Sequence, residues 1–185
     1  MRKIILSMIC LLTFAGCSSV FKDNDNSVKY FNYIDSIISN NYVQSSSIPF
    51  DSSISVGKNE ENEYVYLVTI ENPKIAMYNV EMMALINTEI GKDTMFPTVG
   101  VIDDERYSMI PFQSNLERGY PGAIIVSGVS DTPEFTVNLM VIYHDYSGQN
   151  ETKVYFNLDG KYQDEQQVEE PKEEVEAPTE EGGDE

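Results

Sequence analysis

The most regular alternation of side chains in this 185-residue chain is found in Glu134-Phe135-Thr136-Val137-Asn138-Leu139-Met140-Val141-Ile142-Tyr143-His144. Every second residue from Phe135 to Tyr143 is apolar and would point to one face, while the residues from Thr136 to His144 between them would point to the other. Alternation with a period of two residues predicts a β-strand that buries one face.

Segments on both sides of this strand have the same β-branched and aromatic composition and are separated by turn residues. The expected strands are residues 64–70, 77–86, 106–112, 122–129 and 153–158, with a shorter strand at 54–56. In residues 77–86 the expected core face is Tyr78, Val80, Met82, Ala84 and Ile86. Short strands at this spacing, with no helical period among them, predict a single antiparallel β-sandwich over residues 63–160. A small barrel is the alternative that the pattern leaves open.

The length of that region suits an immunoglobulin-like sandwich of about 100 residues. The Cys…Trp…Cys pattern of antibody domains is missing, because the chain has no Trp and only two Cys. The last hairpin, Val141-Ile142-Tyr143-His144-Asp145-Tyr146-Ser147-Gly148 followed by Val154-Tyr155-Phe156, resembles the end of bacterial immunoglobulin-like accessory domains on secreted and surface proteins. This resemblance implies a fold and carries no activity.

Residues 28–62 are expected to form a short amphipathic helix followed by a Ser-rich loop. Apolar residues recur at spacings of three and four, which marks one face of a helix; they are Val28, Phe31, Ile34, Ile37 and Ile38, with Tyr30 alongside. Asn26 or Ser27 would be the N-cap, and Asn40-Asn41 would end the helix. Packing on the sandwich is the favoured role, because the polar face lacks the Lys/Arg richness of helices that lie on lipid.

The N-terminus has the parts of a signal peptide over residues 1–16: a positive start at Arg2 and Lys3, a short apolar run, and the small pair Ala15-Gly16. The run is too short for a spanning helix of about 20 residues. Phe14-Ala15-Gly16-Cys17 resembles the lipobox of bacterial lipoproteins, with Phe where Leu is usual. The resemblance implies that Cys17 is lipidated and becomes the mature N-terminus, that residues 17–27 are a tether, and that Cys10 is removed.

Charge limits the partners. The chain has 31 acidic and 12 basic residues, and the signal peptide would remove two of the basic ones. Such an acidic surface repels phosphate backbones and anionic lipid, so we expect no nucleic acid, and membrane contact only through the N-terminal lipid. Residues 161–185 contain eleven acidic and two basic residues and are expected to be a disordered tail.

Few residues suggest chemistry, and we predict no catalytic, cofactor-binding or metal residue. His144 is the only histidine, so any His-dependent site must use it; a surface histidine at a hairpin is favoured. Asp103-Asp104-Glu105 could hold calcium through carboxylates, but a solvated turn is favoured. The scattered methionines are expected to fill the core rather than bind copper.

The resulting expectation is a lipid-anchored envelope lipoprotein on the extracytoplasmic face of the cell membrane, or on the outer membrane of a diderm. Its sandwich would be a non-catalytic binding or accessory module for an envelope or surface protein or a glycan. The alternatives are a structural spacer and an enzyme acting on cell wall or carbohydrate.

Overall fold

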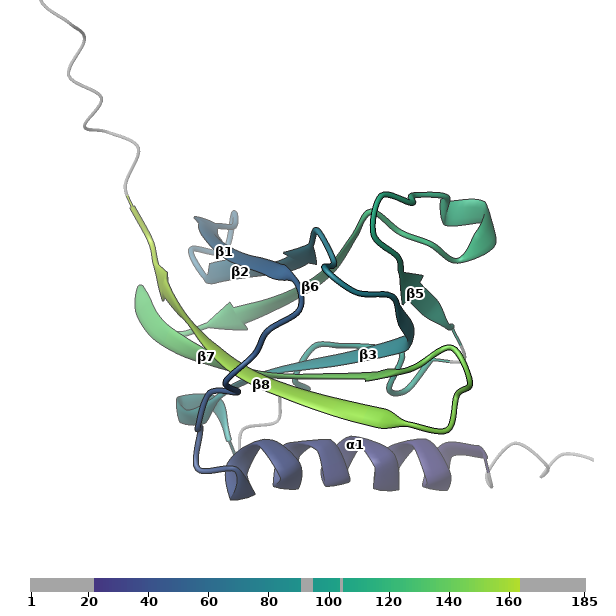
Figure 1. The fold of residues 1–185 in the computed structure, drawn as a ribbon. Helices are drawn as coiled ribbons and strands as arrows, with labels where there is room; N and C mark the ends of the chain where they lie inside the picture. The colour runs from purple at the N-terminus through teal and green to yellow at the C-terminus, as the bar shows by residue number, and fades with distance from the viewer. Residues whose placement is uncertain (1–21, 91–94, 104, 164–185) are drawn as a thin grey trace, which may run out of the picture.

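Two antiparallel sheets and one helix form the part of the chain that the computed structural model describes, residues 22–90, 95–103 and 105–163 (Figure 1). The three-stranded sheet has the order β1 (Asp51–Lys58), β2 (Tyr64–Glu71), β6 (Ala123–Ser130). The five-stranded sheet has the order β4 (Thr98–Val99), β3 (Met77–Ile86), β7 (Glu134–His144), β8 (Glu151–Lys161), and β5 (Tyr107–Met109) also pairs with β3. Helix α1 (Lys22–Ser39) precedes all the strands.

The connectivity of the strands is immunoglobulin-like, as predicted. The first two strands pair and the chain then crosses to the other sheet at β3. It returns at β6, which pairs with β2, and ends in the hairpin β7–β8, in which β7 pairs with β3. In the usual letters, β1, β2 and β6 occupy positions A, B and E, while β3, β7 and β8 occupy C, F and G. The β-sandwich is therefore confirmed, and the barrel alternative is wrong.

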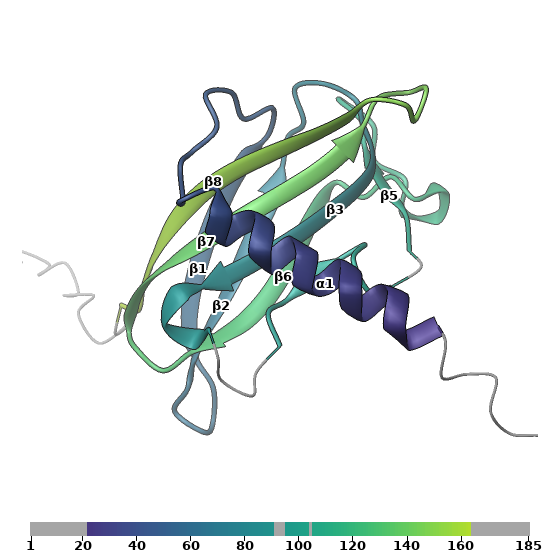
Figure 2. The same cartoon turned by 90° about the horizontal axis from the view of Figure 1, so that it is seen from below.

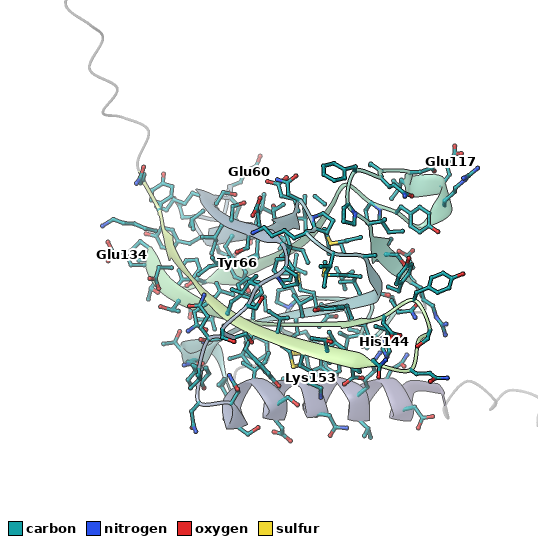
Figure 3. All side chains as sticks on the ribbon, viewed as in Figure 1. Glu60, Tyr66, Glu117, Glu134, His144 and Lys153 are labelled. Atoms are coloured by element: carbon teal, nitrogen blue, oxygen red, sulfur yellow. The ribbon has the colours of Figure 1, made fainter. Side chains whose placement is uncertain are left out.

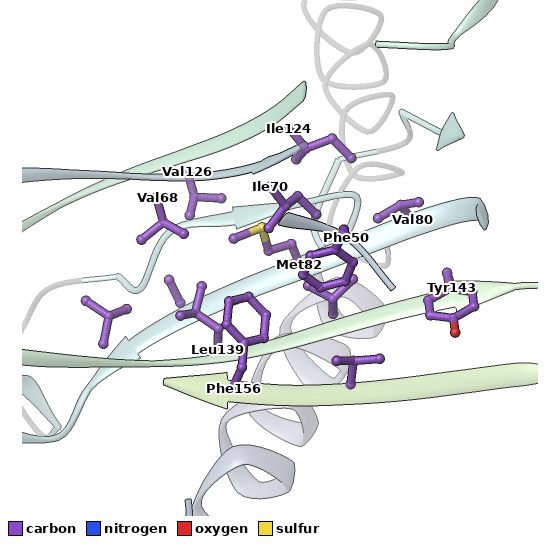
Figure 4. Packing of buried hydrophobic residues seen from close by; sticks show 14 of the residues in the cluster. Phe50, Val68, Ile70, Val80, Met82, Ile124, Val126, Leu139, Tyr143 and Phe156 are labelled. Carbon is purple, nitrogen blue, oxygen red and sulfur yellow. The ribbon is translucent and has the colours of Figure 1, made fainter. Parts of the chain in front are cut away.

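The main core lies between the two sheets (Figure 4). The three-stranded sheet contributes residues such as Val68, Ile70, Ile124 and Val126, and the other sheet contributes Met82, Leu139 and Phe156. Phe50, just before β1, packs edge-to-face on Phe156, with 5.5 Å between ring centroids. The residues of β7 that the alternation places inward, Val137, Leu139, Val141 and Tyr143, are all in this core.

A second apolar cluster lies on the opposite face of the five-stranded sheet, under helix α1. Figure 2 shows α1 crossing the strands β3, β7 and β8 on this face. The buried members of the cluster include Tyr30, Tyr33 and Ile37 of α1 and Met83, Leu85, Met140 and Ile142 of the sheet. The helix packs on the sandwich, as favoured from the sequence, and β3 and β7 are consequently buried on both faces.

The helix differs from its predicted form in start and in orientation. It begins at Lys22 rather than after Asn26 or Ser27. Val28 and Phe31, expected on the buried face, are 59% and 61% exposed, whereas Tyr30, expected there, and Tyr33, which was not, are buried. Tyrosine suits a contact with a polar element because its ring is buried while its hydroxyl keeps a partner. The Tyr30 hydroxyl accepts a hydrogen bond from the Phe96 backbone N–H at 2.6 Å.

The sandwich also begins earlier than expected. Strand β1 extends over eight residues of the segment predicted to be mostly loop, and it pairs with β2 along its whole length. The pattern of β1 is hard to detect because its outward positions are serines and a glycine. The sandwich thus includes residues from Asp51 on, rather than from residue 63.

A bulge in β3 changes the face on which Tyr78 lies. The pairing register shifts between Met77 and Val80, and Asn79 has a positive φ of 49°. The extra residue brings both Met77 and Val80 into the core, so the prediction that Tyr78 shares the face of Val80 is wrong. Tyr78 instead packs against Tyr146, at 5.7 Å between centroids. The predicted signal peptide, Cys17 and the tail from residue 164 lie outside the described residues.

Candidate functional site

A polar cleft of about 330 Å³ lies where the N-terminal half of α1 meets the β3 bulge and the segment after β4. Its charged and polar lining comes from four parts of the chain: Asn26 and Lys29 from α1, Asn79 and Glu81 from β3, Asp103, Glu105 and Arg106 from the segment after β4, and His144 from the end of β7. Glu81 lies between Val80 and Met82, which face the main core, so the alternation of β3 directs Glu81 toward the helix, and the bulge at Asn79 adds a further part of the lining.

Glu81 joins the helix to the sheet with both carboxylate oxygens. Lys29 Nζ lies 2.8 Å from Glu81 Oε1 and donates to it, and the Tyr33 hydroxyl donates to Oε2. Burial raises the pKa of Tyr33, and the hydrogen bond and negative charge of Glu81 raise it further. Tyr33 is therefore a neutral donor at physiological pH, and Glu81 is held between one charged and one neutral donor.

The segment after β4 forms one wall of the cleft and is fastened to the helix. The Gly100 carbonyl accepts from Lys29 Nζ at 3.2 Å, and the Ile102 carbonyl accepts from Asn26 Nδ2 at 3.0 Å. Gly100 has φ +72°, and a Cβ there would lie 2.9 Å from the Val80 carbonyl oxygen. Glycine is required at this position both by the left-handed backbone and by the close approach of the segment to the bulge.

His144 is the most unusual member of the cleft. Its Nδ1 is buried and has no hydrogen-bond partner among the described residues, while its Nε2 lies 3.9 Å from Glu151 Oε2. Figure 3 shows His144 at the end of β7, above the first turns of α1. An imidazole nitrogen that is removed from solvent and unpaired retains an unused capacity to donate or accept a hydrogen bond.

The acidic turn singled out in the sequence is a structural turn. The Asp103 carboxylate accepts from the Gly100 N–H at 3.1 Å and from the Glu105 N–H at 3.2 Å, so both of its oxygens are engaged. Asp104 lies outside the described residues. In the described parts of the chain, no group of three or more His, Cys, Asp or Glu side chains is arranged to hold a metal ion.

The structure thus brings together two features that sequence reasoning considered separately, His144 and the acidic turn. It adds Lys29 and Glu81, which were missed. Glu81 had a visible signal, because it is the one charged residue in the otherwise apolar or uncharged strand Met77–Ile86. Lys29 had none, because a lysine on a helix is normally read as solvated.

Cys17 lies outside the described residues, five positions before the start of α1. Within the described part of the chain, no helix is long and apolar enough to cross a membrane. No family model, no curated protein and no solved structure matches this chain.

Proposed function

We propose that this chain is a lipid-anchored cell-envelope protein, attached through Cys17, whose sandwich is a non-catalytic binding or accessory module. The observation that carries the proposal is the position of α1. The helix starts five residues after Cys17 and is packed on the five-stranded sheet by Tyr30, Tyr33 and Ile37. An anchor at Cys17 would therefore hold the folded domain through a packed helix.

The distances support a domain held close to the bilayer. Five residues span at most about 18 Å when fully extended. The start of α1 and the end of β8 lie at opposite ends of the molecule in both views (Figures 1 and 2). A lipid at Cys17 would place the α1 start toward the membrane and the end of β8, at Lys161, away from it.

The polar cleft is the surface that we propose for binding. It offers donors on Lys29 and Arg106 and acceptors on Glu105. A lining with positively charged donors and a negatively charged acceptor suits a neutral polar group better than an anion. Such a group could be the hydroxyls of a glycan or the backbone of another envelope protein.

The second candidate function is that of a spacer. It is favoured because the start of α1 and the end of β8 lie at opposite ends of the molecule (Figures 1 and 2). A spacer would depend on the acidic segment that follows β8. Deleting residues 164–185 would abolish the function of a spacer, whereas a module that binds through the cleft would keep its ligand affinity.

The test of the anchor uses the two cysteines of the chain. We expect cells that express the chain to incorporate radiolabelled palmitate into it and to retain it in the membrane fraction. Cys17→Ala should lose the label and either be released or remain at the unprocessed mass. Cys10→Ala, the matched control, should be labelled and processed normally. Normal labelling and mature size in Cys17→Ala would contradict the proposal.

A further inference from the structure

In the part of the chain that the structure describes, the three-stranded sheet ends at β6 without a further strand. Strand β6 pairs with β2 along all eight of its residues, Ala123 to Ser130. On its other side no backbone hydrogen bond joins β6 to any described residue. In immunoglobulin sandwiches of the constant type, a fourth strand pairs with the E position that β6 occupies here. The outer edge of β6 is where that strand would lie.

Two apolar pockets lie along this edge, between the two sheets. The first, of about 190 Å³, is lined by Ile124 and Ile125 of β6 and by Val99 and Tyr107 of the opposite sheet. The second, of about 310 Å³, is lined by Gly128 and Val129 of β6 together with residues of the opposite sheet and of the segment before β4, among them Ile86 and Phe96. Because each pocket is shared by both layers, the pockets lie under the place of a missing strand.

The pockets have the spacing of an extended chain. Their centres on β6 are four residues apart, at Ile124 and Gly128. Side chains at positions i and i+4 of a strand point to the same face and lie about 13 Å apart. A single added strand could therefore fill both pockets from one face.

Of the other long edge strands, β1 carries Asp51 and Lys58 at its ends and β8 is protected, whereas β6 has no such protection from the described residues. Strand β8 is covered by residues 42–45: the Ser45 N–H donates to the Tyr155 carbonyl at 2.8 Å, and the Tyr155 N–H donates to Ser45 Oγ at 2.9 Å. Strand β6, Ala-Ile-Ile-Val-Ser-Gly-Val-Ser, has no charge and no proline along its length. Uncharged, unbulged edges are rare in proteins that do not use them for pairing.

We propose that the outer edge of β6 binds an extended segment of a partner protein as an added strand. Main-chain hydrogen bonds would supply affinity, and apolar side chains four residues apart would fill the two pockets. The groove itself is lined by no acidic or basic residue. The chain as a whole has a net charge of −19, so basic residues should flank the apolar part of the partner segment.

A second copy of this chain is a poorer occupant. The inward side chains of its own β6, Ile124 and Val126, are already buried in its own core and are not free to enter another pocket. The inference depends neither on the lipid at Cys17 nor on the polar cleft, since the edge of β6 belongs to the other sheet.

The test uses the full chain in detergent and the peptide Lys-Thr-Val-Thr-Val-Thr-Val-Lys. Its valines at the third and seventh positions are four residues apart, and both of its ends are basic. Hydrogen exchange of the Ala123–Ser130 amides should slow saturably as the peptide is added. The matched peptide Lys-Thr-Ser-Thr-Val-Thr-Ser-Lys keeps the charge and length and should bind at least about tenfold more weakly.

Two lysine variants on the same sheet distinguish peptide binding at the β6 edge from binding elsewhere on the surface of the sheet. Val129 lines the second pocket and Leu67 lies on the central strand away from both pockets, and each is 44% exposed. Val129→Lys should weaken peptide binding about tenfold and Leu67→Lys less than twofold; Ile125→Lys repeats the test at the first pocket. The proposal is overturned by unchanged exchange of β6 up to millimolar peptide, by equal binding to Val129→Lys and Leu67→Lys, or by a peptide-free dimer that protects the same amides.

Discussion

The outer faces of the two sheets differ in what covers them. The outer face of the five-stranded sheet is covered by α1, and residues on it such as Met83 and Met140 are fully buried. The outer face of the three-stranded sheet is bare among the described residues, and Leu67, Ile125 and Val129 are all exposed there. Both faces carry apolar side chains, so exposed apolar residues alone do not distinguish them.

This difference shows that a strand buried on both faces can be recognised by the size of the side chains on its second face as well as by their polarity. The second face of β7 carries Met140 and Ile142, which are large and flexible or branched. The corresponding outward positions of β1 are Ser53, Ser55 and Gly57, which leave nothing for a third layer to pack on. A helix therefore packs under β3 and β7 but would gain little by packing over β1.

The largest expected difference between the two outer faces is in their tolerance of a lysine. Met83→Lys would bury a charge under α1 with no partner provided, and we expect the free energy of unfolding to fall by about 3 kcal/mol or more. Leu67→Lys, on the bare face, should change it by less than about 0.5 kcal/mol. Urea unfolding by circular dichroism measures both, and similar losses for the two variants would show that the bare face is covered in solution.

Two glycines of the three-stranded sheet test the same difference between a packed face and a bare face. A Cβ on Gly128 would lie 2.4 Å from the hydroxyl and 2.5 Å from Cζ of Tyr66, whereas a Cβ on Gly57 would meet nothing within 4 Å. Gly128→Ala must displace the buried Tyr66 ring, and we expect a loss of about 1–3 kcal/mol. Gly57→Ala should be neutral or stabilise the fold by a few tenths of a kcal/mol. Thermal unfolding of the two variants checks this, and a neutral Gly128→Ala would mean that Tyr66 is not held as described.

Most of the fold could be predicted from the sequence because alternation reports burial on one face. The strands β2, β3, β6, β7 and β8 were located to within a few residues, and the sandwich follows from their number and spacing. The pattern could not show the β3 bulge, since a single inserted residue at Asn79 leaves the composition of the strand unchanged. It could not show β1 fully, because small polar outward residues resemble a loop.

The candidate site was less predictable, because it is made of contacts between distant parts of the chain. Lys29, Glu81 and Gly100 are joined across 52 and 71 residues of sequence, so no local spacing reveals them. His144 was singled out only because it is the sole histidine. The face of α1 was predicted only in part: Tyr30 and Ile37 are buried as expected, but hydrophobicity favours Val28 and Phe31 over Tyr33, whose hydroxyl finds a partner in Glu81.

The smallest expected effect concerns the hydrogen bond between Tyr33 of α1 and Glu81 of β3. Its contribution to stability can be measured through its dependence on pH. In the unfolded chain the Tyr33 phenol has the ordinary pKa of 10.0, and in the folded chain burial, followed by the Glu81 carboxylate, raises that pKa. The folded state thus keeps a proton that the unfolded state loses above pH 10. The stability that Tyr33 contributes is fully present below pH 10 and should decline by about 1.4 kcal/mol per pH unit above it.

The difference between the wild-type chain and Tyr33→Phe shows this decline without the other titrating groups. The difference in unfolding free energy should be constant from pH 7 to pH 9 and should change above pH 10 in the direction that favours Phe. In Glu81→Gln the folded pKa of Tyr33 falls, because the neutral amide no longer opposes the phenolate, so the decline attributed to Tyr33 should end at a lower pH. That variant should also lose about 1 kcal/mol at pH 7, because Lys29 keeps its charge but loses its carboxylate partner. A difference between wild type and Tyr33→Phe that does not vary with pH would mean that the Tyr33 hydroxyl is solvated and does not help to attach α1 to the five-stranded sheet.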